Sequence, residues 1–486
     1  MSARLSQLVR RELADDPVIA GVTADSRKVG PGFLFAALPG SNADGATFAP
    51  KAVAAGAAAV LAGKSLAGLG TPVIVSPDPR RAYALAAAAF HGRQPQTCVA
   101  VTGTNGKTSV AAFCRQVFSR AGLTAASMGT LGVRVSRPAG AGDLQITPPG
   151  LTTPDAADVA ELMARMVDEG VTHLALEASS HGVDQRRLDG AKLTAAGFLN
   201  LTQDHLDYHG DMATYRAAKL RLFETLLPRE AIAVLNADSD AYPAFAAAAV
   251  TSGQTVFSVG RAGQGLRLLE RAPMPGGQRL RIDHCGTLYD IELPLAGEFQ
   301  ASNALVAAGL CLAAGVAAGD VMAALGHLEG APGRLQRIGT GPAGGEAYVD
   351  YAHTPDGLQT VLRALRPHVQ GRLIVVFGAG GDRDRTKRPI MGRIAADLAD
   401  IAIVTDDNPR GEDPAAIRAE VRGGTAALQE IGDRRAAIQA AAAMLGAGDV
   451  LVVAGKGHEQ GQTIAGVTHP FDDVAETAQA LGLAHG

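Results

Sequence analysis

The residues best suited to do chemistry form one short run after an apolar stretch at 98–101. They are Gly103, Thr104, Asn105, Gly106, Lys107, Thr108 and Ser109, and an amphipathic segment follows at 110–120. A strand, a glycine-rich turn and a helix start, in that order, direct backbone N–H groups at an anion, and Lys107 adds a positive charge. Thr108 would offer its hydroxyl to the Mg²⁺ that accompanies a nucleoside triphosphate. Val101 stands where the usual phosphate-loop pattern has its first glycine, so an ordinary strand-to-helix turn is the alternative. We expect the run to bind ATP.

Glu177 ends a strand-like run at 173–177. A carboxylate at the end of a strand can hold the metal beside a triphosphate. The alternative is a solvated glutamate, but the polar residues Ser179 to His181 that follow favour a site.

Two histidines, His205 and His209, lie four positions apart in a second polar cluster. This spacing is compatible with zinc, but Leu206 replaces the glutamate of the zinc hydrolase motif, so structural histidines are the main alternative. Lys219 lies in a helical segment at 215–223. As an ammonium it cannot ligate a metal, and a solvated helix lysine is its plain interpretation.

Three strand-like runs near the C-terminus, at 373–377, 401–404 and 450–453, each end in a polar loop. Open parallel sheets bind ligands beyond the carboxyl ends of their strands, so we expect these loops to face one cleft. The loops occupy residues 378–384, 405–410 and 454–459. The first resembles a dinucleotide fingerprint only in part, because Arg383 replaces the required third glycine, and nicotinamide binding is therefore disfavoured.

The elements that position these residues follow an α/β pattern. Apolar, β-branched runs alternate with alanine-rich helical segments, which predicts parallel sheets. Two strands at 33–38 and 57–61, with a helix at 49–55 between them, predict a self-contained N-terminal region. Proline and glycine at 91–95 and 330–333 mark two boundaries. Because 486 residues correspond to about three domains, we predict domains at 1–90, 91–330 and 331–486.

Composition excludes several classes of protein. A net charge of −4 gives no electrostatic footprint for nucleic acid or an anionic membrane. The first ten residues lack an apolar stretch, so we expect no signal peptide, and the apolar run at 82–90 is too short to span a bilayer. The four cysteines form no C-x-x-C pair, and we expect all of them to be buried in a reducing compartment: Cys98, Cys114, Cys285 and Cys311. We therefore expect a soluble cytoplasmic protein with no nucleic-acid partner and no membrane insertion. As a separate expectation, we predict a monomer.

Taken together, the motifs resemble those of the Mur ligase family. They are Gly103-Thr-Asn-Gly-Lys-Thr108, Glu177-Ala-Ser-Ser-His-Gly182, Asp204-His-Leu-Asp-Tyr-His-Gly210, Pro332-Gly-Arg334, Asp350-Tyr-Ala-His-Thr-Pro355 and Gly455-Lys-Gly-His-Glu459. The resemblance extends from residues 25–27 to Glu459. It implies a three-domain α/β architecture with an N-terminal uridine-nucleotide-binding domain, a central P-loop ATPase domain and a C-terminal Rossmann-like domain.

The resemblance also implies a reaction, the ATP-dependent formation of an amide in cytoplasmic peptidoglycan precursor synthesis. ATP would phosphorylate the D-glutamyl γ-carboxylate of UDP-N-acetylmuramoyl-L-alanyl-D-glutamate, and an amine would then displace phosphate from the acyl phosphate. The run Asp407-Asn-Pro-Arg410 resembles the motif of the branch whose amine is meso-2,6-diaminopimelate.

By the same resemblance, the catalytic residues are Lys107, Glu177, His205 and Lys219. The lysine that matches Lys219 is carbamylated in the family (N6-carboxylysine), which would turn it into the oxygen ligand that Mg²⁺ prefers. Our hypothesis is that Thr108 and Glu177 serve one metal, and His205 and carbamylated Lys219 a second. Three further positions match residues around the adenine, ribose and phosphates of ATP: Asn303, Arg334 and Asp350.

The acceptor nucleotide would be held in two domains. Positions around the uridine and its diphosphate are matched by Ala24, Ser26, Ser41, Asn42 and Ala43. Positions around the muramoyl dipeptide are matched by Thr152, Thr153, Ser179, Gln185 and Arg187.

The amino acid would be held by the C-terminal loops, at Arg383, Asp407, Asn408, Pro409, Arg410, Gly455 and Glu459. Diaminopimelate resembles lysine with an additional carboxylate at the far end. The planar fork of Arg410 matches two carboxylate oxygens at once, and Glu459 would pair with the ammonium at the same end. The alternative for residues 407–410 is a plain Asn-Pro turn.

Three other functions remain open at this point. One is a Mur ligase that adds L-lysine. Another is a folylpolyglutamate synthetase-like ligase, which would share the phosphate loop but has no counterpart of the N-terminal uridine domain. The third is a nucleotide-dependent switch or motor subunit, which would leave the three C-terminal loops without a role.

Overall fold

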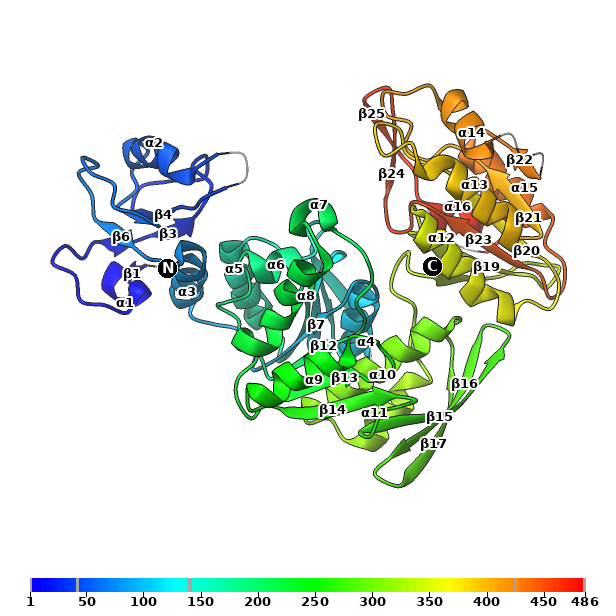
Figure 1. Cartoon of the computed structure of the whole chain (residues 1–486), viewed down its shortest axis with the longest axis horizontal. Coiled ribbons are helices and arrows are strands. Elements are labelled where there is room, and N and C mark those ends of the chain that lie inside the picture. The colour runs from blue at the N-terminus through cyan, green and yellow to red at the C-terminus, as the bar shows by residue number, and fades with distance from the viewer. Residues whose placement is uncertain (1, 41–42, 139–141, 424, 426, 484–486) are drawn as a thin grey trace. The chain divides into compact units, whose positions relative to one another are not determined.

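The structure is a computed structural model that describes residues 2–40, 43–138, 142–423, 425 and 427–483. It divides into two compact units, and many of their helices and strands are labelled in Figure 1. Unit 1 comprises Met1–Leu266 with Val306–Val321, and unit 2 comprises Arg267–Leu305 with Met322–Gly486. Two predicted site residues, Ser41 and Asn42, lie outside the described residues.

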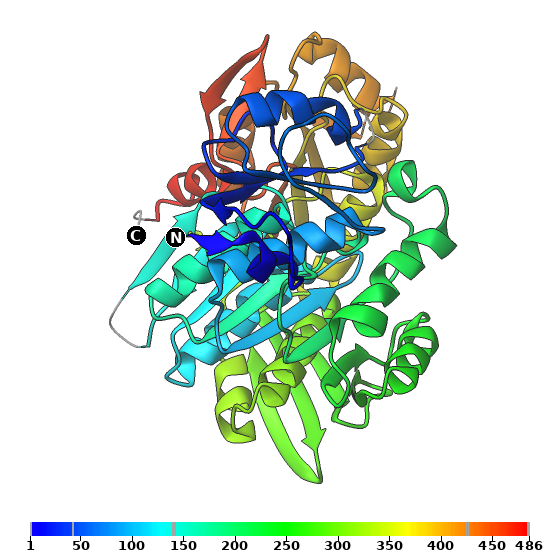
Figure 2. The ribbon, with the colours of Figure 1, turned by 90° about the vertical axis from the view of Figure 1, so that its left-hand side faces the viewer.

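Unit 1 begins with a four-stranded parallel sheet in the order β3-β4-β5-β6. The elements of this part are β1 (Ala3–Arg4), α1 (Leu5–Val9), β2 (Val18–Ile19), β3 (Gly21–Thr23), β4 (Phe33–Ala37), η1 (Gly45–Phe48), α2 (Ala49–Ala54), β5 (Ala59–Ala62), β6 (Val73–Val75) and α3 (Pro79–His91). Leu34 and Ala36 pack with α1 and α3, whereas Phe35 and Ala37 pack with α2 on the other face. Figure 2 shows α2 on one side of this blue sheet. A strand that is buried on both faces is apolar at every position. The apolar run at 33–38 therefore predicted the strand β4.

The central part of unit 1 is built on a sheet in the order β10-β9-β8-β11-β7-β12-β13-β14, parallel from β8 to β14. Its elements are β7 (Thr97–Thr102), α4 (Lys107–Arg120), β8 (Ala125–Gly129), β9 (Gly132–Ser136), β10 (Asp143–Thr147), α5 (Ala156–Asp168), β11 (His173–Glu177), α6 (Ser180–Asp184), β12 (Ala195–Phe198), α7 (Leu206–His209), α8 (Met212–Arg221), the π-helix η2 (Leu222–Leu226), β13 (Ile232–Asn236), α9 (Tyr242–Thr251) and β14 (Thr255–Gly260). Val101 of β7 lies opposite Glu177 of β11. Because these strands are parallel, the loop after β7 and the end of β11 meet at one edge of the sheet.

The N-terminal and central parts of unit 1 are joined through α3 and α5, which pack side by side (Figure 1). Tyr83 on α3 donates a hydrogen bond of 2.5 Å to Asp155, whose carboxylate caps the N-terminus of α5. The first ninety residues therefore have their own sheet but share a helix interface with the central part. This division differs from the three domains predicted above, whose boundaries stay a prediction.

Unit 2 contains an antiparallel ribbon, β15-β16-β17, and a sheet in the order β18-β19-β23-β20-β21-β22, in which only the β18–β19 pair is antiparallel. Its elements are β15 (Leu266–Met274), β16 (Gly277–His284), β17 (Thr287–Leu293), β18 (Gln336–Thr340), β19 (Glu346–Asp350), α12 (Pro355–Leu365), η3 (Arg366–His368), β20 (Leu373–Phe377), α13 (Lys387–Leu398), β21 (Ile401–Val404), α14 (Pro414–Arg422), β22 (Leu428–Glu430), α15 (Arg434–Ala443), β23 (Val450–Ala454), β24 (Gly461–Ile464), β25 (Val467–Pro470) and α16 (Asp473–Ala480). The helices α10 (Glu298–Ala313) and α11 (Ala318–Leu325) have residues in both units.

Helices cover both faces of the second sheet. Leu373, Val375 and Phe377 of β20 pack with α12, α13 and α14. Ile374 and Val376 point the other way and pack with α15 and α16. The predicted strands are confirmed as β20, β21 and β23, and they are parallel neighbours in the order β23-β20-β21. Their three polar loops therefore leave the sheet at the same edge.

The prediction for the cysteines is correct at three positions and wrong at one. Cys98, Cys114 and Cys311 are buried, whereas Cys285 is exposed. Cys285 lies in the turn between β16 and β17 with a φ of 53°, and such a turn projects its residues into solvent. No helix among the described residues is both long and apolar enough to cross a bilayer.

Candidate active site

The phosphate loop, residues 103–109, joins the end of β7 to the start of α4. Gly106 precedes the helix with a φ of 91°, a conformation that favours glycine. A Cβ atom on Gly103 would lie 2.8 Å from the Cβ of Leu199, so the backbone can approach β12 only without a side chain there. The helix begins at Lys107, three residues before the predicted amphipathic segment. The N–H groups of its first turn are therefore directed toward the loop.

Hydrogen bonds hold this loop from both sides. The Lys107 ammonium donates to the carbonyl oxygens of Gly103 at 2.9 Å and Thr104 at 2.8 Å. Asn200, which follows β12, accepts a bond of 2.9 Å from the Asn105 N–H and donates one of 3.2 Å to the Asn105 carbonyl. Asn200 lies five residues before His205, and its role in fixing the loop was not predicted.

Glu177 is 3% exposed and lies next to the start of α4. Its Oε2 accepts a hydrogen bond of 2.9 Å from the Thr108 hydroxyl, and its Oε1 accepts one of 2.8 Å from the Thr130 N–H. A Cβ atom on Gly129 would lie 2.0 Å from Oε1, so only glycine fits there. A pocket lined by Thr108, Glu177 and Arg115, among others, adjoins this pair. A hydroxyl and a carboxylate side by side are the hard oxygen donors that Mg²⁺ prefers.

All five residues predicted to hold the muramoyl dipeptide lie in one hydrogen-bonded group beside Glu177. Thr153 donates to the Glu177 carbonyl at 2.9 Å and lies 2.9 Å from the Ser179 hydroxyl. Arg187 donates to the Thr153 carbonyl at 2.6 Å and to Gln185 at 2.8 Å. Further bonds join Thr152 to Thr130 at 3.0 Å and Gln185 to Tyr208 at 3.1 Å. Thr130 and Tyr208 were not predicted.

Lys219 lies behind the phosphate loop, with 1% of its surface exposed. Its Nζ donates a hydrogen bond of 2.8 Å to the Gly103 carbonyl and lies 4.5 Å from the centre of the Tyr215 ring. Burial, and secondarily the positive charge of Lys107, lower the pKa of Lys219 well below its usual value. The interpretation as a solvated helix lysine is therefore wrong, because α8 turns this side chain into the protein.

His205 lies at the start of α7 with a φ of 53° and a side chain that is 45% exposed. Its ring is 5.0 Å from the His181 ring and 6.2 Å from the Tyr215 ring, over which Lys219 lies. His209 is buried and bonds to the Ser180 hydroxyl at 3.0 Å, as expected of a structural histidine. No cluster of three or more His, Cys, Asp or Glu placed to hold a metal occurs in the described part of the chain.

Of the predicted uridine residues, the structure describes Ala24, Ser26 and Ala43, which lie in loops after β3 and β4, at the carboxyl edge of the N-terminal sheet. Ala24 and Ser26 are half-buried, and Ala43 is exposed. Between the first two, Asp25 accepts bonds from the Arg27 guanidinium and N–H, which lower its pKa to about 2. This pair restrains the turn at residues 25–27.

The predicted ATP residues Asn303, Arg334 and Asp350 lie in unit 2 and are connected to one another. Asn303 donates to Gln300 at 3.1 Å, and Gln300 donates to the Arg334 carbonyl at 3.3 Å. Asp350 accepts bonds from the Leu335 and Ala352 N–H groups at 2.6 and 2.7 Å. Burial raises the pKa of Asp350 to about 6, against the opposing effect of Arg334.

The three C-terminal loops meet at the carboxyl edge of β23, β20 and β21. Asn408 donates a bond of 3.0 Å to Glu459, and Arg410 donates one of 2.8 Å to the Gly381 carbonyl. Arg410 has a φ of 52° and is tied to β24 by its backbone N–H. A Cβ atom on Gly455 would lie 2.4 Å from a carboxylate oxygen of Asp407. These bonds bring the three loops together at one edge of the sheet, and the cleft that we expect them to face stays a prediction.

Two predicted members of this group differ in exposure. Pro409 is buried, whereas Arg383 lies exposed in the first loop. Sequence reasoning missed Tyr351, whose ring lies 4.7 Å from the Arg334 guanidinium and 5.0 Å from the His458 ring. It also missed Lys456, which is fully buried between Asn408 and Gly461.

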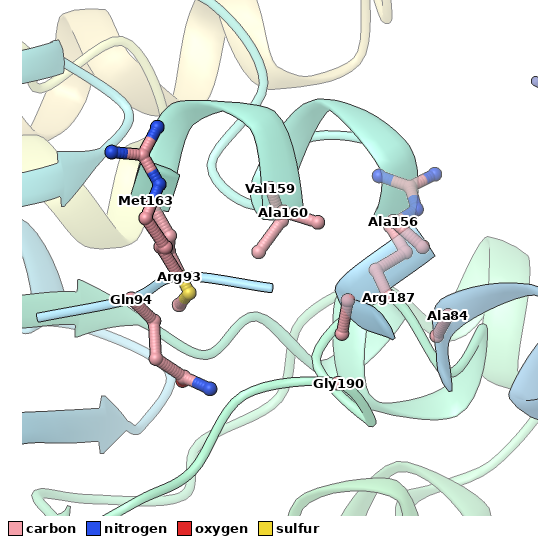
Figure 3. Close-up of a pocket in the computed structure, with 10 residues that line it drawn as sticks. Ala84, Arg93, Gln94, Ala156, Val159, Ala160, Met163, Arg187 and Gly190 are labelled. Atoms are coloured by element: carbon pink, nitrogen blue, oxygen red, sulfur yellow. The ribbon is translucent and has the colours of Figure 1, made fainter. Parts of the chain in front are cut away.

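A further pocket lies in unit 1 between α3 and α5 (Figure 3). Small apolar residues such as Ala84, Ala156 and Ala160 line it. Arg93 and Arg187 lie at its two ends in the view. Because Arg187 also belongs to the dipeptide group, this pocket adjoins the candidate site.

Three regions of the chain match known domain families. Residues 18–91 match the Mur ligase family catalytic domain, residues 101–311 the Mur ligase middle domain, and residues 333–457 the Mur ligase glutamate ligase domain.

Several relatives cover almost the whole chain. A protein of Caulobacter vibrioides named UDP-N-acetylmuramoyl-L-alanyl-D-glutamate–2,6-diaminopimelate ligase is 72% identical over 482 residues, 99% of each chain. One of the same name from Chelativorans sp. is 52% identical over 470 residues, 96% of each chain. A solved structure of that name has 34% identity, a TM-score of 0.76 and 99% coverage of both chains. The fold is shared by the MurF ligase of Thermotoga maritima in complex with ADP, at 17% identity, a TM-score of 0.61, and coverage of 95% of this chain and 96% of that one.

Proposed function

The chain belongs to the Mur ligase family, and from that premise we propose how its residues make an amide through an acyl phosphate. It is an ATP-dependent, amide-forming ligase that adds meso-diaminopimelate to UDP-N-acetylmuramoyl-L-alanyl-D-glutamate in peptidoglycan synthesis. It has the three-domain α/β architecture of that family. We further propose that it works in the cytoplasm as a monomer.

The acceptor carboxylate must be activated because an amine does not displace an oxide or hydroxide ion from it. An oxygen of the D-glutamyl γ-carboxylate attacks the terminal phosphorus of ATP, the bond from that phosphorus to ADP breaks, and an acyl phosphate forms. The diaminopimelate amine then attacks the acyl carbon and loses a proton. The C–O bond breaks, and phosphate leaves with the oxygen that came from the acceptor.

The phosphate loop and Glu177 supply positioning and charge, which this chemistry needs more than covalent help. Lys107 and the N–H groups at the start of α4 bind the triphosphate. Thr108 and Glu177 would hold a Mg²⁺ ion, since their oxygens are 2.9 Å apart and of the type that Mg²⁺ prefers. That ion would offset negative charge on the transferred phosphoryl group. A second Mg²⁺ would be held by His205 and carbamylated Lys219.

The other ligands are distributed over the remaining predicted residues. The uridine diphosphate would contact the loops at Ala24, Ser26 and Ala43, together with Ser41 and Asn42. The adenosine part of ATP would contact Asn303, Arg334 and Asp350. Diaminopimelate would place its far carboxylate on Arg410 and its far ammonium on Glu459, with Arg383, Asp407, Asn408, Pro409 and Gly455 around them.

One observation carries the proposal: residues of the nucleotide motif and of the acceptor motif bond to the same residue, Glu177. Thr108 of the phosphate loop bonds to Glu177, and Thr153 bonds to the carbonyl of the same residue. Thr130 bonds both to Glu177 Oε2 at 3.3 Å and to Thr152 at 3.0 Å. Groups that bind a phosphate and groups that bind the dipeptide are thus held next to each other, as phosphoryl transfer between the two ligands requires.

An isotope experiment tests this reaction. The enzyme is given ATP, Mg²⁺, diaminopimelate and acceptor nucleotide labelled with ¹⁸O in its γ-carboxylate. We expect a product whose mass includes diaminopimelate, and one ¹⁸O atom in each phosphate released. Unlabelled phosphate would refute the acyl phosphate. Equal use of lysine in a parallel reaction would instead refute the choice of amino acid.

Specificity for diaminopimelate should depend on the guanidinium of Arg410. Arg410→Lys should lower kcat/KM for diaminopimelate by at least about tenfold, or 1.4 kcal/mol, because an ammonium cannot form the two parallel bonds of the arginine fork. Steady-state kinetics with varied diaminopimelate measures this. The control is Arg422→Lys, the same change at the end of α14, where Arg422 forms an ion pair with Glu430 of β22. Equal kinetics for the Arg410 variant and the wild type would mean that the fork does not read the substrate.

A further inference from the structure

Lys456 is a fully buried charge beside the diaminopimelate group, and the mechanism above gives it no role. Its Nζ donates to Asn408 Oδ1 at 2.8 Å and to the Gly461 carbonyl at 2.8 Å, and it lies 3.9 Å from an Asp407 carboxylate oxygen. Burying an ammonium is costly unless it is paired and hydrogen-bonded. Residues of the loop 405–410 and of β24 meet these requirements for Lys456.

We propose that Lys456 is a positioning residue that sets specificity for the amino acid substrate by fixing the orientation of the Asn408 amide. This inference rests on the proposed function, because it assigns the effect to the diaminopimelate site. Lys456 does not contact the substrate in this account. It acts on Glu459 through Asn408.

The hydrogen bonds of Asn408 allow only one orientation of its amide. Its Oδ1 accepts from Lys456 and also from the Thr463 N–H at 3.0 Å. If the amide were turned over, its NH₂ group would face an ammonium and a backbone N–H, which are both donors. The Nδ2 atom is therefore directed at Glu459 Oε2, 3.0 Å away.

This arrangement determines how Glu459 meets its ligand. One of its carboxylate oxygens accepts the Asn408 bond, which restrains the position of the carboxylate. A prepositioned carboxylate binds an ammonium without losing rotamer freedom at that step. Without Lys456, Asn408 could turn over or swing away, and Glu459 would lose this support.

The competing explanation is that Lys456 merely ties down the β24–β25 hairpin through the Gly461 carbonyl. That role would lower stability and would weaken all ligands of unit 2 alike. A specificity role predicts instead a selective change in the KM for diaminopimelate, and a dependence on Asn408.

Lys456→Met tests the proposal, because methionine retains the length of the side chain but neither donates nor carries charge. We expect the KM for diaminopimelate to rise at least about tenfold, the effect of losing a bond to a charged group. The KM values for ATP and for the acceptor nucleotide should stay within about twofold of the wild type, since their ligands are elsewhere. The control is Arg372→Met. This change removes the ion-pair partner of the buried Asp449 carboxylate, at the opposite edge of the same sheet. It should lower the thermal midpoint without changing the KM for diaminopimelate.

Two further variants decide between the explanations. Lys456→Met in an Asn408→Ala background should raise this KM no further, because both changes remove the same support. Asn408→Asp keeps both acceptor contacts but has no N–H for Glu459, so it should give the same selective rise with Lys456 in place. Independent, multiplying effects in the double variant, or an unchanged KM in Asn408→Asp, would overturn the proposal. Failure of the wild type itself to ligate diaminopimelate would refute the proposed function instead.

Discussion

Lys219→Ala should slow ligation by about 10²–10³-fold, the loss typical when one group that stabilises transition-state charge is removed. The structure gives a physical reason why this lysine can react with CO₂. Its Nζ and that of Lys107 both donate to the Gly103 carbonyl, at 2.8 and 2.9 Å. Burial and this neighbouring charge lower the pKa of Lys219, so a larger share of it is the neutral amine at a given pH. Only the neutral amine has the lone pair that attacks CO₂, and the resulting carbamate would be an oxygen ligand for Mg²⁺.

The measurement combines kinetics with a direct signal for the modification. Protein equilibrated with ¹³C-bicarbonate should show a carbamate resonance that is absent from Lys219→Ala. Formate or acetate should restore part of the activity of the variant, because the removed side chain leaves a buried space beside Gly103. Lys192→Ala, at an exposed lysine, is the control. Wild-type rates in Lys219→Ala would exclude a carbamate from the reaction.

The placement of the three C-terminal loops could be predicted because it depends only on where the strands lie in the sequence and on their parallel direction. Runs that are apolar at every position indicate strands covered on both faces, and parallel strands present their carboxyl ends at one edge. The predicted bounds of β20 and β21 therefore coincide with the observed ones, Leu373–Phe377 and Ile401–Val404. The same argument brings Glu177 of β11 to the phosphate loop, which follows its neighbour β7.

The pairing of individual side chains could not be predicted. Asn408 bonds to Lys456 and Glu459, which are 48 and 51 positions away, and this depends on how the β24–β25 hairpin folds over the loop. Thr130 holds Glu177 with its backbone N–H, which has no signal in the residue type. Whether Lys219 faces solvent depends on the rotation of α8, whose apolar residues do not define a clear face. The sequence therefore indicates which loops meet, but not which of their atoms bond.

Lys107→Met should lower kcat by about 10²–10³-fold while raising the KM for ATP by no more than about tenfold. In the structure, Lys107 folds back on its own loop and donates to the carbonyls of Gly103 and Thr104. These bonds fix the position of its charge beside the proposed phosphate site. Negative charge on the transferred group redistributes in the transition state, so a fixed cation stabilises that state more than the bound substrate.

Initial rates at varied ATP, with ATP-analogue affinity from calorimetry, separate the effect on kcat from the effect on ATP binding. Lys192→Met controls for the loss of a positive charge. A variant that loses only ATP affinity, with its kcat intact, would show that Lys107 binds the nucleotide equally in both states and that catalysis lies with the metal ligands.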